Sequence, residues 1–439
     1  MPLQTLPCRA FQRGFALGAR LLPWRTPTVL SGAGSLLKLP DVFSREGASR
    51  PLVVASRRQC ADERFLALRA ALEGRGIRPS VFSGVEPDPS VATVENLAAQ
   101  YRADGCDSFL VLGGGSPIDA AKVAAARVVR PDKTVSQLGG LLKVRRPLPL
   151  FIAVPTTAGT GSEATIAAVV TGEEHRKYAV SDLCLIPRYA VLDPTLTLSL
   201  PPAVTAQTGM DALSHAVEAY LSLYYNTRET RALAESAVRD IFRYLPVACR
   251  DGQSLTARER MLRASFDAGC AFTRASVGNV HAIAHTLGGL YGIPHGLACA
   301  VTLPVVLEDY GAAVHPRLAR LGSLIGLTGT ERERAVGFLA AIRALNASLG
   351  IPDRFDGIRG EDLPAWRPGP PPRPTPSTPS PSCTIRRVSA ACSSGCAPEP
   401  PHASHLCRCL TKPLLTFLAK PPFLCYNGSI NFSEMKERP

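Results

Sequence analysis

The chain has 439 residues, of which 46% are apolar, and a formal net charge of +13. This length and composition predict two globular domains rather than one small core. No apolar run reaches the roughly 18 residues of a membrane-spanning helix, so we expect no membrane span. Residues 367–439 carry nine Lys or Arg against three acids, a net of +6. The rest of the chain is therefore too weakly basic to predict a nucleic-acid partner.

The first 40 residues contain four arginines and no acidic residue. This composition fits a mitochondrial presequence, but FQRGFALGARLLPW also fits an amphipathic helix that lies against the body. We interpret residues 1–25 as an amphipathic segment and expect a cytoplasmic protein, with a mitochondrial location as the alternative. The cysteines before Trp366 are scattered and form no CxxC pair. They are typical of small buried side chains in a reducing compartment.

Residues 26–200 alternate between short apolar runs and amphipathic helical patterns. Such runs are typical of parallel strands that are buried on both faces. They are PLVVAS (51–56), SFLVLGG (108–114), LFIAVPTT (150–157) and YAVLDP (189–194). The order of strands and helices predicts an α/β, Rossmann-like dinucleotide-binding domain.

Residues 201–366 have apolar residues spaced by three and four, which predicts amphipathic helices. We therefore expect an all-α C-terminal domain that begins after Pro201 and Pro202. After Trp366 the chain reads RPGPPPRPTPSTPSPS. Dense proline and serine with a net charge of +6 predict that residues 367–439 form a disordered C-terminal tail.

Two glycine-rich segments each follow an apolar strand. GGGSPID (113–119) leads from a strand into a helix that opens at Pro117, and PTTAGTGSE (155–163) adds hydroxyl groups and two glycines at the end of the next strand. Glycines let a phosphate approach the backbone, and the free N–H groups of a helix start attract it. An ordinary tight turn would need only one glycine. Two such loops at strand ends predict one nucleotide crevice, although neither is the GxGxxG fingerprint.

Residues 279–296, NVHAIAHTLGGLYGIPHG, contain three histidines and no charged residue. A spacing of four puts two of these histidines on one helix face, and GMDALSHAVEAY repeats that spacing with an aspartate and a histidine. A single buried histidine would be an ordinary core residue, but a carboxylate clustered with imidazoles predicts a divalent metal site. A catalytic metal takes three or four protein ligands, so spacing does not decide among five candidates. These are Asp211, His215, His281, His285 and His295.

Five segments in order resemble the iron-containing alcohol dehydrogenase family, also called group III, over residues 22–360. They are GGGSPID, PTTAGTGSE, LDPTLTLSLPP, GMDALSHAVEAY and HAIAHTLGGLYGIPHG. The resemblance implies a divalent metal, Fe²⁺ first and Zn²⁺ as the alternative, held by Asp211, His215, His281 and His295. His285 is then the catalytic residue near the nicotinamide of NAD or NADP. The cofactor-binding residues that we predict are Ser56, Gly114, Gly115, Ser116, Asp119, Thr156, Thr157, Thr160 and Lys177.

The resemblance implies an NAD(P)-dependent alcohol dehydrogenase or carbonyl reductase that transfers hydride between an alcohol, or a hydroxy acid, and the cofactor. A metallohydrolase and a catalytically silent family member are the alternatives. The second alternative arises because the family's last helices should follow DLPAW, where the proline-rich tail begins instead. The partner is a small alcohol or aldehyde. The identity of that substrate stays open, and so does the oligomeric state, with a homodimer as one option.

The end of the second strand differs from that of many NAD-using family members, which have an acidic residue there. This chain has Ser56, followed by Arg57 and Arg58. Ser56 cannot repel a 2′-phosphate, and two arginines can bind one through charge-assisted hydrogen bonds. The alternative is that both arginines are simply solvated. We expect a preference for NADPH.

Overall fold

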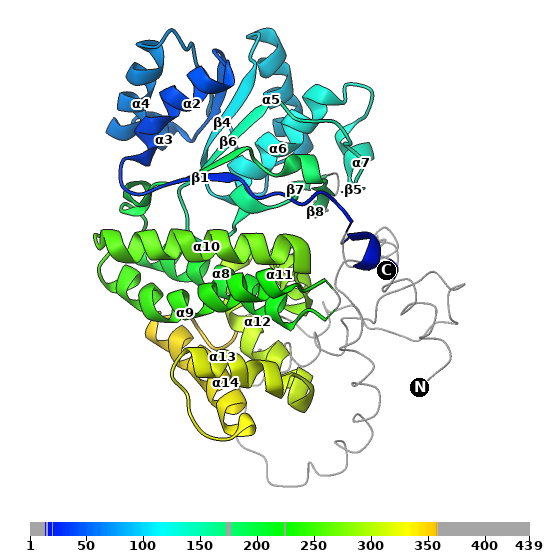
Figure 1. Cartoon of the computed structure of the whole chain (residues 1–439), viewed down its shortest axis with the longest axis vertical. Helices are drawn as coiled ribbons and strands as arrows, with labels where there is room; N and C mark the ends of the chain where they lie inside the picture. The colour runs from blue at the N-terminus through cyan, green and yellow to red at the C-terminus, as the bar shows by residue number, and fades with distance from the viewer. Residues whose placement is uncertain are drawn as a thin grey trace, which may run out of the picture.

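The computed structural model describes residue 14, residues 16–19, 21–172, 177–223 and 225–356, and residue 358. The predicted disordered tail, residues 367–439, lies outside the described residues, and so does most of the predicted N-terminal segment, 1–25. In the described part, an α/β unit lies against a bundle of helices (Figure 1).

A six-stranded sheet forms the centre of the α/β unit. Its strand order is β1 (Thr28–Ser31), β9 (Tyr189–Leu192), β6 (Leu150–Pro155), β4 (Ser108–Gly113), β2 (Pro51–Val54) and β3 (Ser80–Phe82). All the pairings between these strands are parallel. Helices on both sides bury the central strands, which explains why their sequences are continuous apolar runs. The predicted α/β fold class is confirmed.

Helices cover both faces of this sheet (Figure 1). Along β4, Phe109 and Val111 pack with helices α5 (Val91–Ala103) and α6 (Gly115–Val129). Leu110 and Leu112 belong instead to the core of α2 (Leu39–Glu46) and α4 (Glu63–Glu73). Successive side chains of a strand point to opposite faces, so one strand supplies both cores.

The strand order contains a topological switch point between β2 and β4. From β2 the chain first adds β3 on one side, and it then crosses back to place β4 on the other side. At such a point the connections leave in opposite directions, and a crevice opens beyond the carboxyl ends of the strands. Ser56 and the glycines after β4 are at these ends.

A smaller sheet was not predicted from the sequence. It contains β5 (Gly140–Leu141), β8 (Lys177–Ser181) and β7 (Ala167–Thr171), with β7 antiparallel to β8. Strand β5 has only two residues, and β7 reads AAVVT, so neither sequence shows an alternation of apolar and polar residues that would predict a strand. The short helices are α3 (Arg57–Cys60) and α7 (Val135–Leu138), and the 3₁₀ turns are η2 (Ser35–Lys38), η3 (Ser162–Ala164), η5 (Leu183–Leu185), η6 (Pro194–Thr197) and η7 (Gly311–Val314).

The C-terminal half of the described chain is helical, as predicted. Its helices are α8 (Pro202–Leu221), α9 (Arg228–Arg250), α10 (Leu255–Ala275), α11 (Asn279–Tyr291), α12 (His295–Tyr310), α13 (His315–Leu324) and α14 (Glu331–Ser348). Helix α8 is buried on nearly all sides, because α9, α10, α11 and α12 pack around it. The predicted metal ligands lie on α8, α11 and α12.

One stretch of the described chain, His295–Leu324, is long and apolar enough to cross a membrane by length and composition alone. Of its most apolar window, 56% is buried inside the protein. A core helix passes the same test, and α12 contacts α8, α11 and α14. This stretch is therefore weak evidence for a membrane span.

The α/β unit and the helices meet at a backbone contact between two glycines. A Cβ atom built on Gly269 of α10 would lie 2.7 Å from the carbonyl oxygen of Gly161, in the loop after β6. Gly161 itself has a φ of 59°, in the left-handed region that favours glycine. The loop that carries Thr156, Thr157 and Thr160 therefore rests directly on the helical domain.

We expect Gly269→Ala to lower the free energy of unfolding by roughly 1–3 kcal/mol, because the added methyl group would press on backbone that has little room to move. Urea unfolding measures this change. Gly289→Ala in α11 is the matched control, since a Cβ there meets nothing within 4 Å, and it should stabilise the chain slightly. Equal stability of Gly269→Ala and the parent would contradict the tight contact.

Candidate active site

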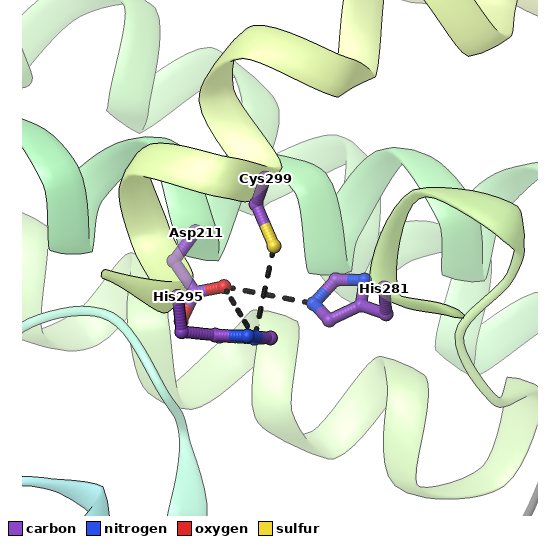
Figure 2. Close-up of side chains that lie close together, drawn as sticks. All are labelled: Asp211, His281, His295 and Cys299. Atoms are coloured by element: carbon purple, nitrogen blue, oxygen red, sulfur yellow. Dashed lines mark hydrogen bonds and ion pairs between the residues drawn. The ribbon is translucent and has the colours of Figure 1, made fainter. Parts of the chain in front are cut away.

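Three of the predicted metal ligands converge from three helices (Figure 2). Asp211 comes from the middle of α8, His281 from the first turn of α11, and His295 is the first residue of α12. The Asp211 Oδ1 atom lies 3.6 Å from His281 Nε2 and 3.5 Å from His295 Nε2. Helix α11 ends at Tyr291, and Gly292 follows with a φ of 66°, which turns the chain so that α12 starts at the cluster.

Cys299 joins these residues, and the sequence analysis missed it as a site residue. Its Sγ atom lies 3.7 Å from His295 Nε2, and it points toward the other side chains (Figure 2). The ligand atoms of Asp211, His281, His295 and Cys299 all lie within 4.8 Å of one another. The signal was available, because Cys299 is four residues after His295 and such spacing places both on one helix face.

His215 lies beside this group rather than in it. Its ring stacks on Phe272 at a centroid distance of 4.1 Å and on His281 at 4.3 Å. The Nδ1 atom of His215 is buried and has no hydrogen-bond partner. Burial lowers the pKa of His215 to about 3, so the ring is neutral at physiological pH. Its role as a ligand stays a prediction.

The residues present fit a divalent metal. Asp211 Oδ1 and His281 Nε2 are buried without a hydrogen-bond partner, as is His215 Nδ1. Leaving such an atom unpaired costs roughly 1–3 kcal/mol, and a cation bound among them would remove that cost. Carboxylate, imidazole and thiolate groups are all ligands of Zn²⁺ and Fe²⁺.

Glu218 fixes the orientation of His281. Its Oε2 atom lies 2.6 Å from His281 Nδ1, while the backbone N–H groups of Gly278 and Val280 donate to the same carboxylate at 2.8 Å. The N-terminus of α11 is thereby held against α8. With the Nδ1 proton directed at Glu218, the Nε2 lone pair of His281 faces Asp211.

The histidines of the site differ in their affinity for protons. Burial opposes a charge on His281, but Cys299, Asp211 and Glu218 together raise its pKa well above the usual value. Burial lowers the pKa of His285 well below that value, and the neighbouring His295 and His281 lower it further. The His285 ring lies 4.8 Å from that of His295, between centroids. A neutral imidazole is therefore available next to the cluster.

His295 is the most exposed of the clustered side chains. The side chains of Asp211 and His281 are each 3% exposed, whereas that of His295 is 34% exposed. Electrostatic interactions of the buried Asp211 and His281 are therefore stronger than they would be in water.

The two glycine-rich loops contact each other at the end of the sheet. A Cβ atom on Gly114 would lie 3.2 Å from Thr157 Oγ1, and one on Gly115 would lie 2.9 Å from Thr160 Cγ2. A side chain at either glycine would force Thr157 or Thr160 to shift, so the close packing of the two loops favours glycine at both positions, in addition to any role at a phosphate. Gly114 is also the N-cap of α6, and Ser116 lies in its first turn. The sequence analysis predicted this juxtaposition.

Hydrogen bonds link the end of β2 to one of these loops. Ser56 caps α3 by accepting a hydrogen bond from the backbone N–H of Gln59 at 3.2 Å. The side-chain amide of Gln59 donates to Thr156 Oγ1 at 3.1 Å. Ser56 is thus connected to Thr156 through Gln59, a residue that the sequence analysis did not consider.

Asp119 and Lys122 of α6 form hydrogen bonds with the second glycine-rich loop and with the residues that follow it. Asp119 accepts hydrogen bonds from the Ser162 hydroxyl and from the backbone N–H of Val169. Lys122 Nζ donates to the carbonyl oxygens of Ser162 at 2.6 Å and Thr165 at 2.8 Å. The structure therefore gives Asp119 a positioning role, and its direct contact with a cofactor stays a prediction.

Lys177 lies between the α/β unit and α11. Its Nζ atom forms an ion pair with Asp88 Oδ1 at 2.7 Å, and it would lie 3.8 Å from a Cβ atom on Gly288. Lys177 also contributes to the low pKa of His285. Lys177 Nζ thus lies next to α11, and the role of Lys177 at the cofactor stays a prediction.

The comparisons with known proteins decide the family. Residues 26–194 match the family model "Iron-containing alcohol dehydrogenase", and residues 205–367 match "Fe-containing alcohol dehydrogenase family, C-terminal". The 1,3-propanediol dehydrogenase of Klebsiella pneumoniae is 41% identical over 301 residues, which cover 67% of this chain and 77% of that protein. The chain belongs to the iron-containing alcohol dehydrogenase family.

Solved structures of this family share the fold. A 1,3-propanediol oxidoreductase superposes with a TM-score of 0.77 at 33% identity, covering 85% of this chain and 100% of that one. Sulfoacetaldehyde reductase from Bifidobacterium kashiwanohense, in complex with NAD⁺, has a TM-score of 0.71 at 30% identity and covers 78% and 90%. The predicted family is confirmed, and the chain is an alcohol dehydrogenase of the iron-containing type.

The second glycine-rich loop of this alcohol dehydrogenase ends in a buried acid. Glu163 is 1% exposed, and its Oε1 atom has no hydrogen-bond partner. Burial raises the pKa of Glu163 to about 7, although the positive charge of Lys122 opposes the shift. The folded chain therefore keeps a proton that the unfolded chain releases near the ordinary pKa of 4.5.

Between pH 4.5 and about 7 the folded state binds more protons at Glu163, so this residue lowers the free energy of unfolding as pH rises. We expect the stability of Glu163→Gln relative to the parent to increase across this window and to stay constant above it. Urea unfolding at several pH values measures the difference. Glu259→Gln, on the exposed side of α10, is the control. A pH-independent difference for Glu163→Gln would contradict the raised pKa.

Proposed function

We propose that this chain is an NAD(P)-dependent, metal-dependent alcohol dehydrogenase that interconverts a small alcohol and its aldehyde or ketone. The observation that carries the proposal is the convergence of Asp211, His281 and His295, with buried ligand atoms that lack hydrogen-bond partners. The relatives act on small alcohols and aldehydes according to their names, which supports this substrate class.

The metal ligands that we propose are those implied by the resemblance: Asp211, His215, His281 and His295. A bound divalent cation would supply Lewis acidity, which lowers the pKa of an alcohol hydroxyl or polarises a carbonyl group. Asp211 supplies negative charge in a dry site, and Glu218 holds His281 in the tautomer that presents Nε2. His295 forms the exposed edge, where the substrate enters.

His285 is the residue that we propose for proton transfer. It lies one turn after His281 on α11, and its ring is close to that of His295. Because burial and the neighbouring imidazoles hold its pKa well below the usual value, His285 is neutral and accepts a proton only briefly before passing it on. It is therefore suited to relay the alcohol proton away from the site.

The crevice at the strand ends is the proposed cofactor site. The free N–H groups at the start of α6 and the loop of Thr156, Thr157 and Thr160 offer donors for a pyrophosphate. NAD⁺ in the Bifidobacterium reductase supports a nicotinamide cofactor here, since that structure shares the fold. The nicotinamide accepts or gives the hydride in this class of reaction.

The first test compares two histidines of one helix. His281→Ala should lose the bound metal and the activity together, because it removes a ligand from an otherwise buried site. His285→Ala, the matched variant one turn away, should keep the metal but lower turnover or change its pH profile. Metal analysis and alcohol oxidation by the metal-loaded full chain, with NAD⁺ and with NADP⁺, provide the readouts.

Each unexpected result of this test leads to a different conclusion. A His281→Ala variant with a full metal content would overturn the ligand assignment. A metal-free His285→Ala variant would show that His285 is a ligand instead. Metal-loaded parent protein that binds no nicotinamide cofactor would point to a metallohydrolase, and one that binds the cofactor without turnover would point to a silent family member.

The second test concerns the choice between NADH and NADPH. Arg57 and Arg58 are exposed and directly follow Ser56 at the switch point of the sheet. We expect the parent to prefer NADPH and the Arg57→Ala, Arg58→Ala double variant to lose that preference, at a cost of roughly 1–3 kcal/mol in NADPH binding. Titration of both cofactors measures the effect. A parent that binds NADH more tightly would show that the arginines are only solvated charges.

A further inference from the structure

The hydrogen bond between Gln59 and Thr156 spans the switch point of the large sheet. Gln59 lies just after β2 and Thr156 just after β6, and β4 lies between these two strands in the sheet. At the end of β4, Gly113 pairs with Pro155 and its carbonyl oxygen accepts from the backbone N–H of Thr156 at 2.9 Å. The side chain of Gln59 therefore reaches across the carboxyl end of β4, where a dinucleotide binds in folds of this class.

The side-chain amide of Gln59 has one hydrogen-bonding group to spare. Its Oε1 atom accepts from the backbone N–H of Ser56 at 2.7 Å. Its nitrogen carries two protons, and one of them is donated to Thr156 Oγ1 at 3.1 Å. Among the described residues, the second proton has no acceptor. Because the Gln59 side chain is only partly buried, this N–H group is available to a ligand in the crevice.

The alternative explanation is that Gln59 only completes the capping box of α3. A capping box needs two hydrogen bonds between its first and last residues, and the contact with Thr156 is not one of them. A second box of the same kind, formed by Thr134 and Gln137, begins α7. In the described chain no residue accepts from the amide nitrogen of Gln137. The bond from Gln59 to a predicted cofactor residue is therefore additional to capping.

We propose that Gln59 is a specificity-determining residue of the cofactor site, which donates its free amide proton to the 2′ oxygen of the adenosine ribose. This inference rests on the proposed function, since it requires a nicotinamide cofactor in the crevice. The end of the second strand commonly reads the 2′ group, but the Ser56 hydroxyl there already accepts from the backbone of Gln59. A neutral amide can donate to a hydroxyl or to a phosphate. Gln59 therefore admits both cofactors, and the exposed Arg57 and Arg58 add the preference for NADPH.

The test replaces Gln59 by Glu. A carboxylate oxygen also accepts from the Ser56 N–H, so Gln59→Glu keeps the capping box and the start of α3. The new negative charge accepts a hydrogen bond from a 2′-hydroxyl but repels a 2′-phosphate. We expect the dissociation constant of NADPH to rise at least about tenfold, while that of NADH stays the same or falls. Titration of the full chain, followed by nicotinamide fluorescence, measures both constants without turnover.

Gln137→Glu is the matched control, because it makes the same charge change in the same kind of capping box. Figure 1 shows α3 and α7 on opposite sides of the α/β unit, so this variant should leave the ratio of the two constants unchanged. Gln59→Met gives a second readout. It keeps the length of the side chain without a donor or a charge, and it should weaken both cofactors by roughly two- to tenfold.

The possible failures are distinguishable. If the parent binds a nicotinamide cofactor but Gln59→Glu leaves the ratio of the two constants unchanged, Gln59 does not read the 2′ group and the dehydrogenase remains. A Gln137→Glu variant that shifts the ratio equally would also overturn the inference, because a long-range charge effect would then suffice. The same holds for a Gln59→Met variant with unchanged affinity for both cofactors. Metal-loaded parent protein that binds neither NADH nor NADPH would overturn the proposed function as well.

Discussion

The burial of the Asp211 carboxylate is the constraint on which the catalytic domain depends. An isolated buried charge is too costly to keep, and it persists only when other groups or a cation balance it. Helix α8 carries Asp211 through the middle of the bundle, and two of the helices around it bring a compensating group. Helix α11 brings His281 and α12 brings His295. Burial disfavours the Asp211 carboxylate, but His281 and His295, whose own pKa values are raised, help to hold the pKa of Asp211 below its usual range.

The α/β unit meets the helical domain through backbone contacts as well as through the side chain of Lys177. The loop after β6 contacts α10 at Gly161 and Gly269 and contacts the first glycine loop at Thr157. The backbone N–H of Ile166 also donates to Thr273 Oγ1 on α10 at 2.8 Å. One loop therefore belongs to both halves of the active site, and its position sets the distance between the cofactor crevice and the ligand cluster.

Much of this arrangement could be predicted from the sequence, because it depends on local patterns. The apolar runs predicted the central strands. The spacing of four predicted that Asp211 shares a helix face with His215, and that His281 shares one with His285. Contacts between distant segments were not predictable in this way. Glu218 is an ordinary acid in the sequence, and only the packing of α8 against α11 reveals that it orients His281.

Cys299 shows a different limit of the sequence analysis. The same spacing that drew attention to Asp211 and His215 also relates Cys299 to His295. A cysteine in an apolar helix is usually a core residue, so spacing alone was no reason to place it beside His295. Only the structure shows that the Cys299 Sγ atom lies 3.7 Å from His295 Nε2.

The burial of Lys122 makes it an internal reporter of loop motion. Its amine donates to the carbonyl oxygens of Ser162, in the second glycine-rich loop, and of Thr165, just after that loop. An acylating reagent therefore reaches the amine only when this segment moves. Burial also lowers the pKa of Lys122 to about 8, a shift that lasts only while the amine is enclosed. The labelling rate of this one lysine, followed by mass spectrometry, would therefore measure how often this segment moves away from α6.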